Sequence, residues 1–302
     1  MKIWVNGTLL ERDDAKVHVL DAGLQHAVGV FETMQARSGV IFRGQNHLQR
    51  LADSGRELGL LERLNTVPLL DAAHATVAAN GLSAARVRLT VTGGDLNALT
   101  TGGAGPVDPT IIITATPPTQ YPDTFVTEGV TATIAEGRDN PFDLMAGHKT
   151  LNYWSRIREL QVAAQKEAGE ALRFTVSNHL ASGSVSNAFL VRDGVLQTPI
   201  ARGEEEQGAL PSSVLPGITR AAVIEIAERL GIAVERRMLD IEELLGSSEL
   251  FLTNSSWGIL PVVRVERETI GSGLVGDVTS RLRAELVATI VEETSSGSTG
   301  VE

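Results

Sequence analysis

Short β-strand patterns joined by glycine-containing turns recur along this chain, and they constrain its fold more than any other feature. The stretch "KIWVNGTLL" (residues 2–10) places two short apolar segments around an Asn-Gly pair, the strongest short-range indication of a β-hairpin. "GVFETMQARSGVIFRG" (29–44) repeats the pattern around "RSG". "RFTVSNHLASGSVSNAFLVRDGVLQTP" (173–199) has the pattern of paired strands joined by an Asp-Gly turn. These segments predict several hairpin-like strand pairs.

Helical patterns lie between these strands. "NHLQRLADSGRELGL" (46–60) carries leucines at roughly helical spacing before a glycine, and a second helix is expected from Val67 to Ala79. Further helices are expected in "NYWSRIRELQVAAQKEAGE" (152–170) and in "PGITRAAVIEIAERLGI" (216–232), which starts on a proline-glycine pair. This mixture of elements predicts the α+β fold class.

Two consecutive prolines, Pro117 and Pro118, close an apolar strand pattern and are the best candidate for a boundary between domains. A chain of 302 residues is long enough for two domains, each with its own core. The Ser/Gly/Thr-rich end of the chain has no hydrophobic periodicity and is expected to be disordered. The expected segments are an N-terminal α+β domain, a linker, a C-terminal domain and a disordered tail, at residues 1–117, 118–126, 127–286 and 287–302.

The composition argues against several classes of function. The chain has no cysteine, which excludes disulfides, thiolate metal sites and a cysteine nucleophile. A formal net charge of -11 and an aromatic content of 4% argue against a nucleic-acid partner. No apolar run approaches a signal peptide or the roughly 20 residues of a membrane span, so a cytoplasmic protein with no membrane partner is expected. The six histidines show no helical ligand spacing, and we expect no metal site.

One lysine, Lys149 in "AGHKTLNYW" (146–154), is a candidate nucleophile. Most lysines are solvated surface charges, because lysine is almost never fully buried unless it is paired. The neighbours of Lys149 are small, apolar or amide-bearing and offer little carboxylate pairing. A lysine in such a setting tends to lose its proton, as a Schiff-base amine must. Taken alone, the residue leaves both interpretations open.

Two polar turns are candidates for binding an anion. "LPGITR" (215–220) starts a helix and brings backbone N–H groups, the Thr219 hydroxyl and the helix dipole to one point. "TNSSWG" (253–258) follows an apolar strand and offers hydroxyls and N–H groups suited to phosphate. The alternatives are an ordinary helix start and an ordinary loop.

Over roughly residues 1 to 280, these stretches occur in an order that resembles the class IV, or fold type IV, family of pyridoxal-phosphate enzymes. This family includes branched-chain aminotransferases, D-amino acid aminotransferases and 4-amino-4-deoxychorismate lyase. The motifs that carry the resemblance are "WVNG", "DAGLQHAVGVFET", "FRGQNHLQRL", "GHKTLNYW", "ASGSVSNAFLV", "LPGITR" and "TNSSWGILPV". The resemblance implies a two-domain fold, with a smaller N-terminal α/β domain and a larger, β-barrel-like C-terminal domain with flanking helices.

The resemblance implies a pyridoxal 5'-phosphate cofactor and a role for each matching residue. Lys149 matches the lysine that forms a Schiff base with the cofactor and moves the proton between substrate Cα and cofactor. Tyr153 matches a tyrosine near the cofactor's phenolic oxygen, and Leu215 matches a side chain that packs on the ring. The residues that match phosphate-binding positions are Arg50, Gly217, Ile218, Thr219, Ser255 and Ser256.

The resemblance also implies an amino-acid substrate, a 2-oxo acid partner and a homodimer. His26 and Phe31 match residues that line the substrate pocket, and Arg88 matches an arginine that receives a substrate carboxylate. An exposed strand arginine is the alternative for Arg88. The leading hypothesis is a transaminase acting on a branched-chain-like or D-amino acid. An aminodeoxychorismate-type lyase that releases pyruvate is the second, because Thr33 stands where branched-chain enzymes usually have glycine.

One residue departs from the family pattern. Ser182 stands where the family usually has a glutamate that faces the pyridine nitrogen of the cofactor. A carboxylate keeps that nitrogen protonated, whereas a hydroxyl can only donate to it or accept from it. We therefore expect slower transamination, or another acid in place of the glutamate, or a reaction such as β-elimination. A cofactor-binding relative with weakened catalysis is a third hypothesis.

Overall fold

The computed structural model describes residues 1–62, 64–95 and 108–295 of the chain. Their contacts form two compact units. The first unit comprises Met1–Thr119, Lys149–Asn152 and the segment from Ile290 on, and the second comprises Gln120–His148 and Tyr153–Thr289. The expected division treats each domain as one continuous segment, whereas the contacts place two later segments, one of them containing Lys149, in the first unit.

The first unit is built on a six-stranded antiparallel sheet, with the order β2-β1-β6-β5-β3-β4. Its strands are β1 (Lys2–Val5), β2 (Thr8–Glu11), β3 (Gly29–Arg37), β4 (Val40–Ile41), β5 (Ala85–Thr92) and β6 (Ile111–Thr116). The expected hairpin of β1 and β2 is confirmed, and its turn residues Asn6 and Gly7 have φ angles of 42° and 96°, as a tight hairpin turn requires.

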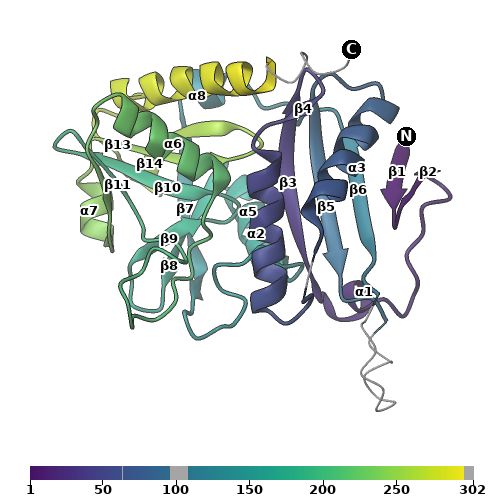
Figure 1. Cartoon of the computed structure of the whole chain (residues 1–302). Helices are drawn as coiled ribbons and strands as arrows, with labels where there is room; N and C mark the ends of the chain where they lie inside the picture. Colours follow the sequence, from purple (N-terminus) through teal and green to yellow (C-terminus); the bar gives the residue numbers. More distant parts are fainter. Residues whose placement is uncertain (63, 96–107, 296–302) are drawn as a thin grey trace. The chain divides into compact units, whose positions relative to one another are not determined.

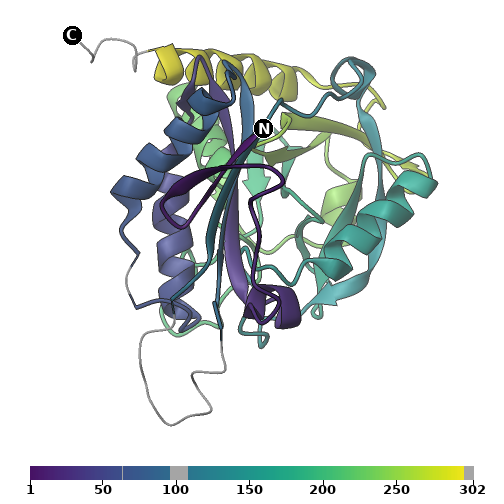
Figure 2. The same cartoon turned by 90° about the vertical axis from the view of Figure 1, so that its right-hand side faces the viewer.

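Two long helices of the first unit, α2 (Gly44–Glu57) and α3 (Thr66–Ala79), pack on its sheet, and both are confirmed as expected. Figures 1 and 2 show them on the same face of the sheet. Met34, Leu48, Leu51 and Leu89 meet between these layers and are fully buried. The short helix α1 (Ala22–His26), which no sequence pattern indicated, precedes β3. This core holds β3 and α2 together, and both elements carry candidate site residues.

The second unit is built on a nine-stranded mixed sheet, ordered β12-β11-β10-β13-β14-β7-β8-β9, with β15 paired to β14. Because β9 at one end of this order also contacts β10, the sheet curls on itself in a barrel-like way. Its strands are β7 (Val130–Asp139), β8 (Glu170–Thr175), β9 (Leu180–Gly183), β10 (Asn187–Arg192), β11 (Val195–Thr198), β12 (Val234–Arg236), β13 (Glu249–Asn254), β14 (Gly258–Val265) and β15 (Glu268–Thr269).

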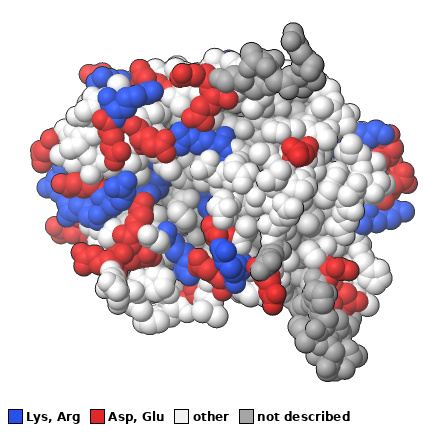
Figure 3. Space-filling model, in the orientation of Figure 1, with Lys and Arg blue, Asp and Glu red and all other residues white. Residues whose placement is uncertain are grey.

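Helices flank this sheet. Helix α5 (Trp154–Gln165) packs on β7 and β8, α6 (Ile218–Arg229) on β13, and α4 (Thr124–Thr127) on β14. Helix α7 (Ile241–Leu245) begins with a capping box between Asp240 and Glu243. On the second unit, at the left of Figure 3, acidic and basic side chains are interspersed. The net negative charge is therefore not gathered in one patch on the face shown.

The end of the chain differs from expectation. Residues 287–295 were expected to belong to a disordered tail, but they continue helix α8 (Asp277–Ser295). Leu286 and Ile290 are buried, so tertiary packing extends the helix into a sequence that is rich in serine and threonine. The rest of the expected tail, 296–302, lies outside the described residues. Within the described ranges, no helix combines the length and the apolar character that a membrane span requires.

Candidate active site

Lys149 is fixed at the start of strand β3. Its carbonyl oxygen accepts a hydrogen bond from the Phe31 N–H at 2.9 Å, and the Leu151 N–H donates to the Gly29 oxygen at 2.9 Å. A Cβ at Gly29 would lie 2.6 Å from the Val91 oxygen, so only glycine allows this close approach of backbones. The Lys149 Nζ atom lies 4.5 Å from the centre of the Phe31 ring. The backbone of the candidate nucleophile is therefore held by main-chain pairing.

A buried carboxylate orients Arg50. Glu32 on β3 is 1% exposed and accepts from Arg50 Nε at 2.8 Å and from Arg50 Nη2 at 2.6 Å, which is the bidentate geometry of a strong ion pair. His47 Nδ1 lies 2.7 Å from the second oxygen of the same carboxylate. Burial opposes the charge of Glu32, but Arg50 and His47 outweigh it and lower the pKa of Glu32 to about 2. Glu32 therefore stays ionised and holds Arg50 in one orientation.

His47 on α2 is neutral in this setting. Burial lowers its pKa, the Glu32 carboxylate opposes that effect, and the charges of Arg50 and Lys149 lower the pKa further. A neutral imidazole donates from Nδ1 to the carboxylate and adds no positive charge. Arg50 is thus the cation whose side chain Glu32 holds in one orientation. Neither Glu32 nor His47 was expected as a site residue, although both lie inside quoted motifs.

The three expected substrate residues lie in different settings. Phe31 is buried on β3, and the guanidinium carbon of Arg88 on β5 lies 3.7 Å from the centre of its ring. Arg88 Nε also donates to Thr90 Oγ1 at 3.3 Å, so Arg88 is a stacked, half-buried arginine rather than an exposed one. His26 lies at the exposed end of α1. The sheet therefore brings Phe31, Arg88 and Lys149 together, while no contact joins His26 to that group in the described part of the chain.

The start of helix α6 in the second unit has the form of an anion site. Gly217 is the N-cap residue and no side chain caps the helix, so the first N–H groups have no side-chain partner from the cap. A Cβ at Gly217 would overlap the side-chain oxygen of Asn187, whose Nδ2 donates to the Leu215 oxygen at 2.8 Å. Thr219 is buried on the first turn. Asn187, which the motifs did not single out, thus fixes the turn that leads into the helix.

A second polar turn joins β13 to β14. Asn254 Oδ1 accepts from the N–H groups of Ser256 and Trp257 at 2.8 and 3.1 Å, and Asn254 Nδ2 donates to the Val185 oxygen at 3.2 Å. This side-chain turn shapes the backbone around Ser255 and Ser256, which are both half-buried. The two hydroxyl-bearing residues are therefore presented on a fixed loop.

Tyr153 and Ser182 are linked through an arginine that sequence analysis missed. Tyr153 is the N-cap residue of α5, and the guanidinium carbon of Arg156, one turn later, lies 5.9 Å from the centre of its ring. Arg156 Nη1 donates to Ser182 Oγ on β9 at 3.4 Å. The spacing of Tyr153 and Arg156 on one helix turn could have suggested that they share a face, but their meeting with Ser182 depends on the fold.

Glu170 on β8 shapes the turn that follows Ser182. Its carboxylate accepts from the N–H groups of Ser184 and Val185, each at 3.2 Å, and from the Ser186 hydroxyl at 3.0 Å. Burial raises the pKa of Glu170 against the opposing effect of these donors. All its contacts are to this turn and to its own strand, so its role is structural.

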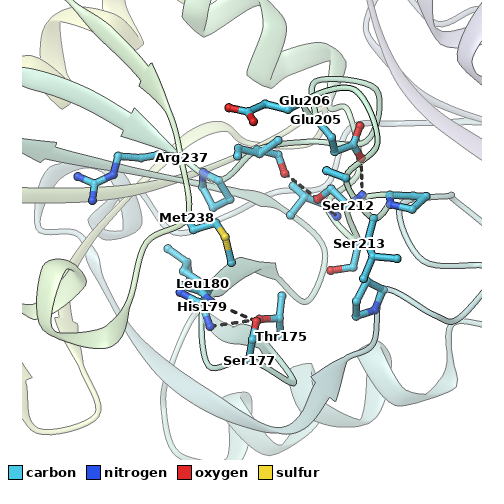
Figure 4. Close-up of a pocket in the computed structure, with 17 residues that line it drawn as sticks. Thr175, Ser177, His179, Leu180, Glu205, Glu206, Ser212, Ser213, Arg237 and Met238 are labelled. Carbon is cyan, nitrogen blue, oxygen red and sulfur yellow. Dashed lines mark hydrogen bonds between the residues drawn. The ribbon is translucent and has the colours of Figure 1, made fainter.

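A cavity of about 540 Å³ lies elsewhere in the second unit, between the segments 175–180, 199–214 and 237–238 (Figure 4). Its lining is mostly apolar, with the Ser177–His179 pair at one side and Ser212 and Ser213 at the other. None of the expected cofactor residues lines it. Among the described residues, no group of three His, Asp or Glu side chains is placed to hold a metal ion.

The residues described above are a lysine held against a strand and an oriented arginine in the first unit, and an uncapped helix start and a hydroxyl-bearing turn in the second. The chain belongs to the class IV amino-transferase family, whose model matches residues 29–265. It is 33% identical to a putative branched-chain-amino-acid aminotransferase of Methanocaldococcus jannaschii, over 94% of each chain. The chain is therefore an enzyme, an aminotransferase.

Two solved structures place the fold. The branched-chain amino acid aminotransferase of Escherichia coli matches with a TM-score of 0.87 and 30% identity, over 97% of this chain and 95% of that one. The 4-amino-4-deoxychorismate lyase of Pseudomonas aeruginosa matches with a TM-score of 0.79 and 28% identity, over 95% and 98%. The expected α+β class and fold type IV are confirmed.

The donors present fit a phosphorylated pyridine aldehyde. The helix start at Ile218 and Thr219 suits a phosphate dianion, and the bidentate pair of Arg50 with Glu32 gives one cation a fixed direction. Ser182 Oγ accepts from Arg156, but none of the described residues accepts its own proton. Each unit therefore contains hydrogen-bond donors that would bind the cofactor.

Proposed function

We propose that this aminotransferase uses pyridoxal 5'-phosphate, attached to Lys149, to move the amino group of an amino acid to a 2-oxo acid. The observation that most supports the proposal is the fixed position of Lys149 against β3, the strand that carries Phe31 and the Arg50 partner Glu32. When bound, the cofactor supplies an aldehyde that takes up the amino group and a ring that withdraws electrons from the substrate Cα.

In this proposal most of the residues that bind the phosphate and the ring lie in the second unit, whereas Arg50 lies in the first. Ile218 and Thr219 donate from the helix start, and Gly217 leaves the room that the turn needs. Tyr153 would donate to the phenolic oxygen, Leu215 would pack on the ring, and Ser182 would contact the ring nitrogen. The remaining phosphate donors are Arg50, Ser255 and Ser256. Lys149 Nζ would hold the cofactor, and the same amine would serve as the base that moves the proton at the substrate Cα.

We propose a branched-chain-like amino acid as substrate. Phe31 offers a buried apolar surface, and Arg88 stacked on that ring offers a guanidinium for the substrate carboxylate. His26 lines the substrate pocket in this proposal. We also propose that the enzyme is a homodimer and cytoplasmic. The names of the branched-chain relatives support this substrate, and a D-amino acid is the alternative.

Borohydride reduction tests the attachment of the cofactor. The purified protein is expected to absorb as a yellow enzyme, to bleach with borohydride and to carry the cofactor mass on the peptide that contains Lys149. Lys149→Ala is expected to lose the adduct, while Lys166→Ala, a lysine at the exposed end of α5, keeps it. A colourless wild type that takes up no pyridoxal phosphate would refute the proposal.

Single amino acids then test the substrate. L-leucine, L-valine and D-alanine are each added to the loaded enzyme, and conversion to the pyridoxamine form is followed by absorbance. The lyase is a second candidate, because the Pseudomonas lyase is a structural neighbour and Thr33 pairs in register with Arg88. Pyruvate release from 4-amino-4-deoxychorismate, with no conversion by any amino acid, would favour the lyase.

A further inference from the structure

Within the described residues, Ser182 has one hydrogen-bond partner, and its own proton has no acceptor. The residue is 5% exposed and lies on β9 directly opposite Arg173 of β8, so the two side chains are on the same face of the sheet. Its Oγ accepts from Arg156 Nη1 at 3.4 Å. In the described part of the chain, no carbonyl, carboxylate or hydroxyl accepts the proton of Ser182. The structure therefore leaves this hydroxyl as a donor.

The guanidinium of Arg156 is held in place by several acceptors. Nη1 also donates to the carbonyl oxygens of Gly183 and Ser184 at 3.4 and 3.3 Å. Nη2 donates to Asp139 Oδ2 at 3.4 Å. With Tyr153 on its other side, Arg156 lies against the two residues that the proposed function assigns to the edge of the cofactor ring. A fixed cation thus stands beside Ser182.

The described carboxylates near Ser182 all have hydrogen-bond partners other than Ser182. Asp139 Oδ1 accepts from Arg173 Nε and Nη2 at 2.9 and 2.6 Å, and Glu159 accepts from Arg173 Nη1. The other oxygen of Glu159 accepts from the Gly137 N–H at 3.0 Å. Glu170 is bound to the turn after β9. No carboxylate among the described residues takes the place of the usual glutamate, so the charge that contacts Ser182 is positive.

We infer that Arg156 makes Ser182 a hydrogen-bond donor, and that the pair holds the ring nitrogen of the cofactor in its unprotonated form. The inference rests on the proposed function, which places Ser182 at that nitrogen. If the nitrogen carried a proton, the Ser182 oxygen would have to accept from both the pyridinium and Arg156, while the proton of the hydroxyl had no acceptor among the described residues. If the nitrogen is unprotonated, the Ser182 proton has an acceptor and Arg156 has no cationic neighbour on the ring.

Arg156 is therefore a positioning residue, and it sets the reaction preference of the enzyme. An unprotonated ring nitrogen withdraws fewer electrons from the substrate Cα, so removal of the Cα proton by Lys149 is slower than with a carboxylate at position 182. Ser182→Glu is expected to raise the transamination half-reaction rate. The structure thus favours one of the outcomes that the sequence left open: no second acid replaces the missing glutamate.

The experiment measures the protonation state directly. Pyridoxal phosphate labelled with ¹⁵N in the ring is loaded onto the wild type, Arg156→Lys, Arg156→Gln and Ser182→Glu, and the ring ¹⁵N resonance is followed from pH 6 to pH 9. The wild type and Arg156→Lys are expected to show the unprotonated pyridine position throughout. Arg156→Gln is expected to move toward the pyridinium position at the acid end, and Ser182→Glu is expected to show it at every pH.

A binding titration gives an independent measurement. Ser182→Ala removes the donor and is expected to raise the Kd for the cofactor about tenfold, whereas Ser155→Ala, an exposed hydroxyl at the start of the same helix α5, is expected to leave it unchanged. A wild-type resonance at the pyridinium position, or an Arg156→Gln resonance identical to the wild type at every pH, would overturn the inference while leaving the proposed function intact. A protein with no bound resonance and no Lys149 adduct would refute both.

Discussion

Replacing Glu32 by glutamine tests how the first unit holds Arg50. Glutamine keeps the shape of the side chain but removes the charge that Arg50 and His47 share. The pKa of Glu32 falls from an ordinary 4.5 to about 2, which corresponds to roughly 3 kcal/mol of stabilisation, since one pKa unit is worth about 1.4 kcal/mol. Loss of one partner of a buried ion pair costs about 3–5 kcal/mol, so both arguments predict a similar effect.

The sign of the pH dependence follows from the direction of the pKa change. A carboxyl group with a lowered pKa in the folded state contributes stability that is fully present above pH 4.5 and is lost as the pH falls toward 2. The difference in unfolding free energy between wild type and Glu32→Gln should therefore be about 3 kcal/mol at pH 7. It should shrink by about 1.3 kcal/mol between pH 5.5 and pH 3.5.

Urea unfolding followed by Trp4 fluorescence measures this difference. Trp4 lies on β1 and packs against the core of the first unit, and replacing Trp154 and Trp257 by phenylalanine leaves it as the only tryptophan. Glu62→Gln, an exposed carboxyl with no ion pair among the described residues, is the control and should be neutral at each pH. A stable Glu32→Gln variant at pH 7, or a difference that does not change with pH, would refute the role assigned to this carboxylate.

Three further substitutions test other parts of the structure. Arg173→Met leaves Glu159 without its ion-pair partner and leaves Asp139 only the longer contact to Arg156, so it should cost about 3–5 kcal/mol in urea unfolding. A loss below about 1 kcal/mol would contradict this prediction. Gly217→Ala forces a Cβ against the Asn187 side chain, and this should lower the free energy of unfolding by about 1–3 kcal/mol. It should also weaken cofactor binding in a titration. Unchanged binding would argue against the helix start as the phosphate site. Gly55→Ala, in the last turn of α2, places its Cβ 3.6 Å from the Leu61 side chain, which is an ordinary contact. It should stabilise the first unit by about 0.4–1 kcal/mol in the Trp4 assay. A destabilised variant would mean that the site is more tightly packed than its contacts indicate.

Elements with a strong local signal could be predicted from the sequence. The Asn-Gly hairpin of β1 and β2 depends on two adjacent residues that tolerate positive φ, and α2 depends on leucines with helical spacing. Helix α6 begins within two residues of the expected start because a proline-glycine pair precedes it. In each case the information lies within one short continuous segment of the chain.

The networks around the site residues could not be predicted in that way. Glu32, His47 and Arg50 come from a strand and the following helix, and a motif can show that they are present but not that one carboxylate serves two partners. The cluster around Ser182 draws on more of the chain, because Asp139, Arg156 and Arg173 lie on β7, α5 and β8. The helical end of α8 was missed for a similar reason, since its stability comes from packing rather than from propensity.

The rule that buried charges need partners leaves a cation oriented in the first unit and leaves Ser182 without a neighbouring acid in the described part of the second. Buried charges must be paired. In the first unit the buried acid Glu32 accepts two hydrogen bonds from Arg50 and so fixes the orientation of that guanidinium. In the second unit the buried charge at the centre is a cation, Arg173, and it takes up both Asp139 and Glu159. No acid is then left for Ser182, whose neighbour is the cation Arg156. Ser182 is therefore part of a polar cluster in which the described carboxylates Asp139, Glu159 and Glu170 each have partners of their own.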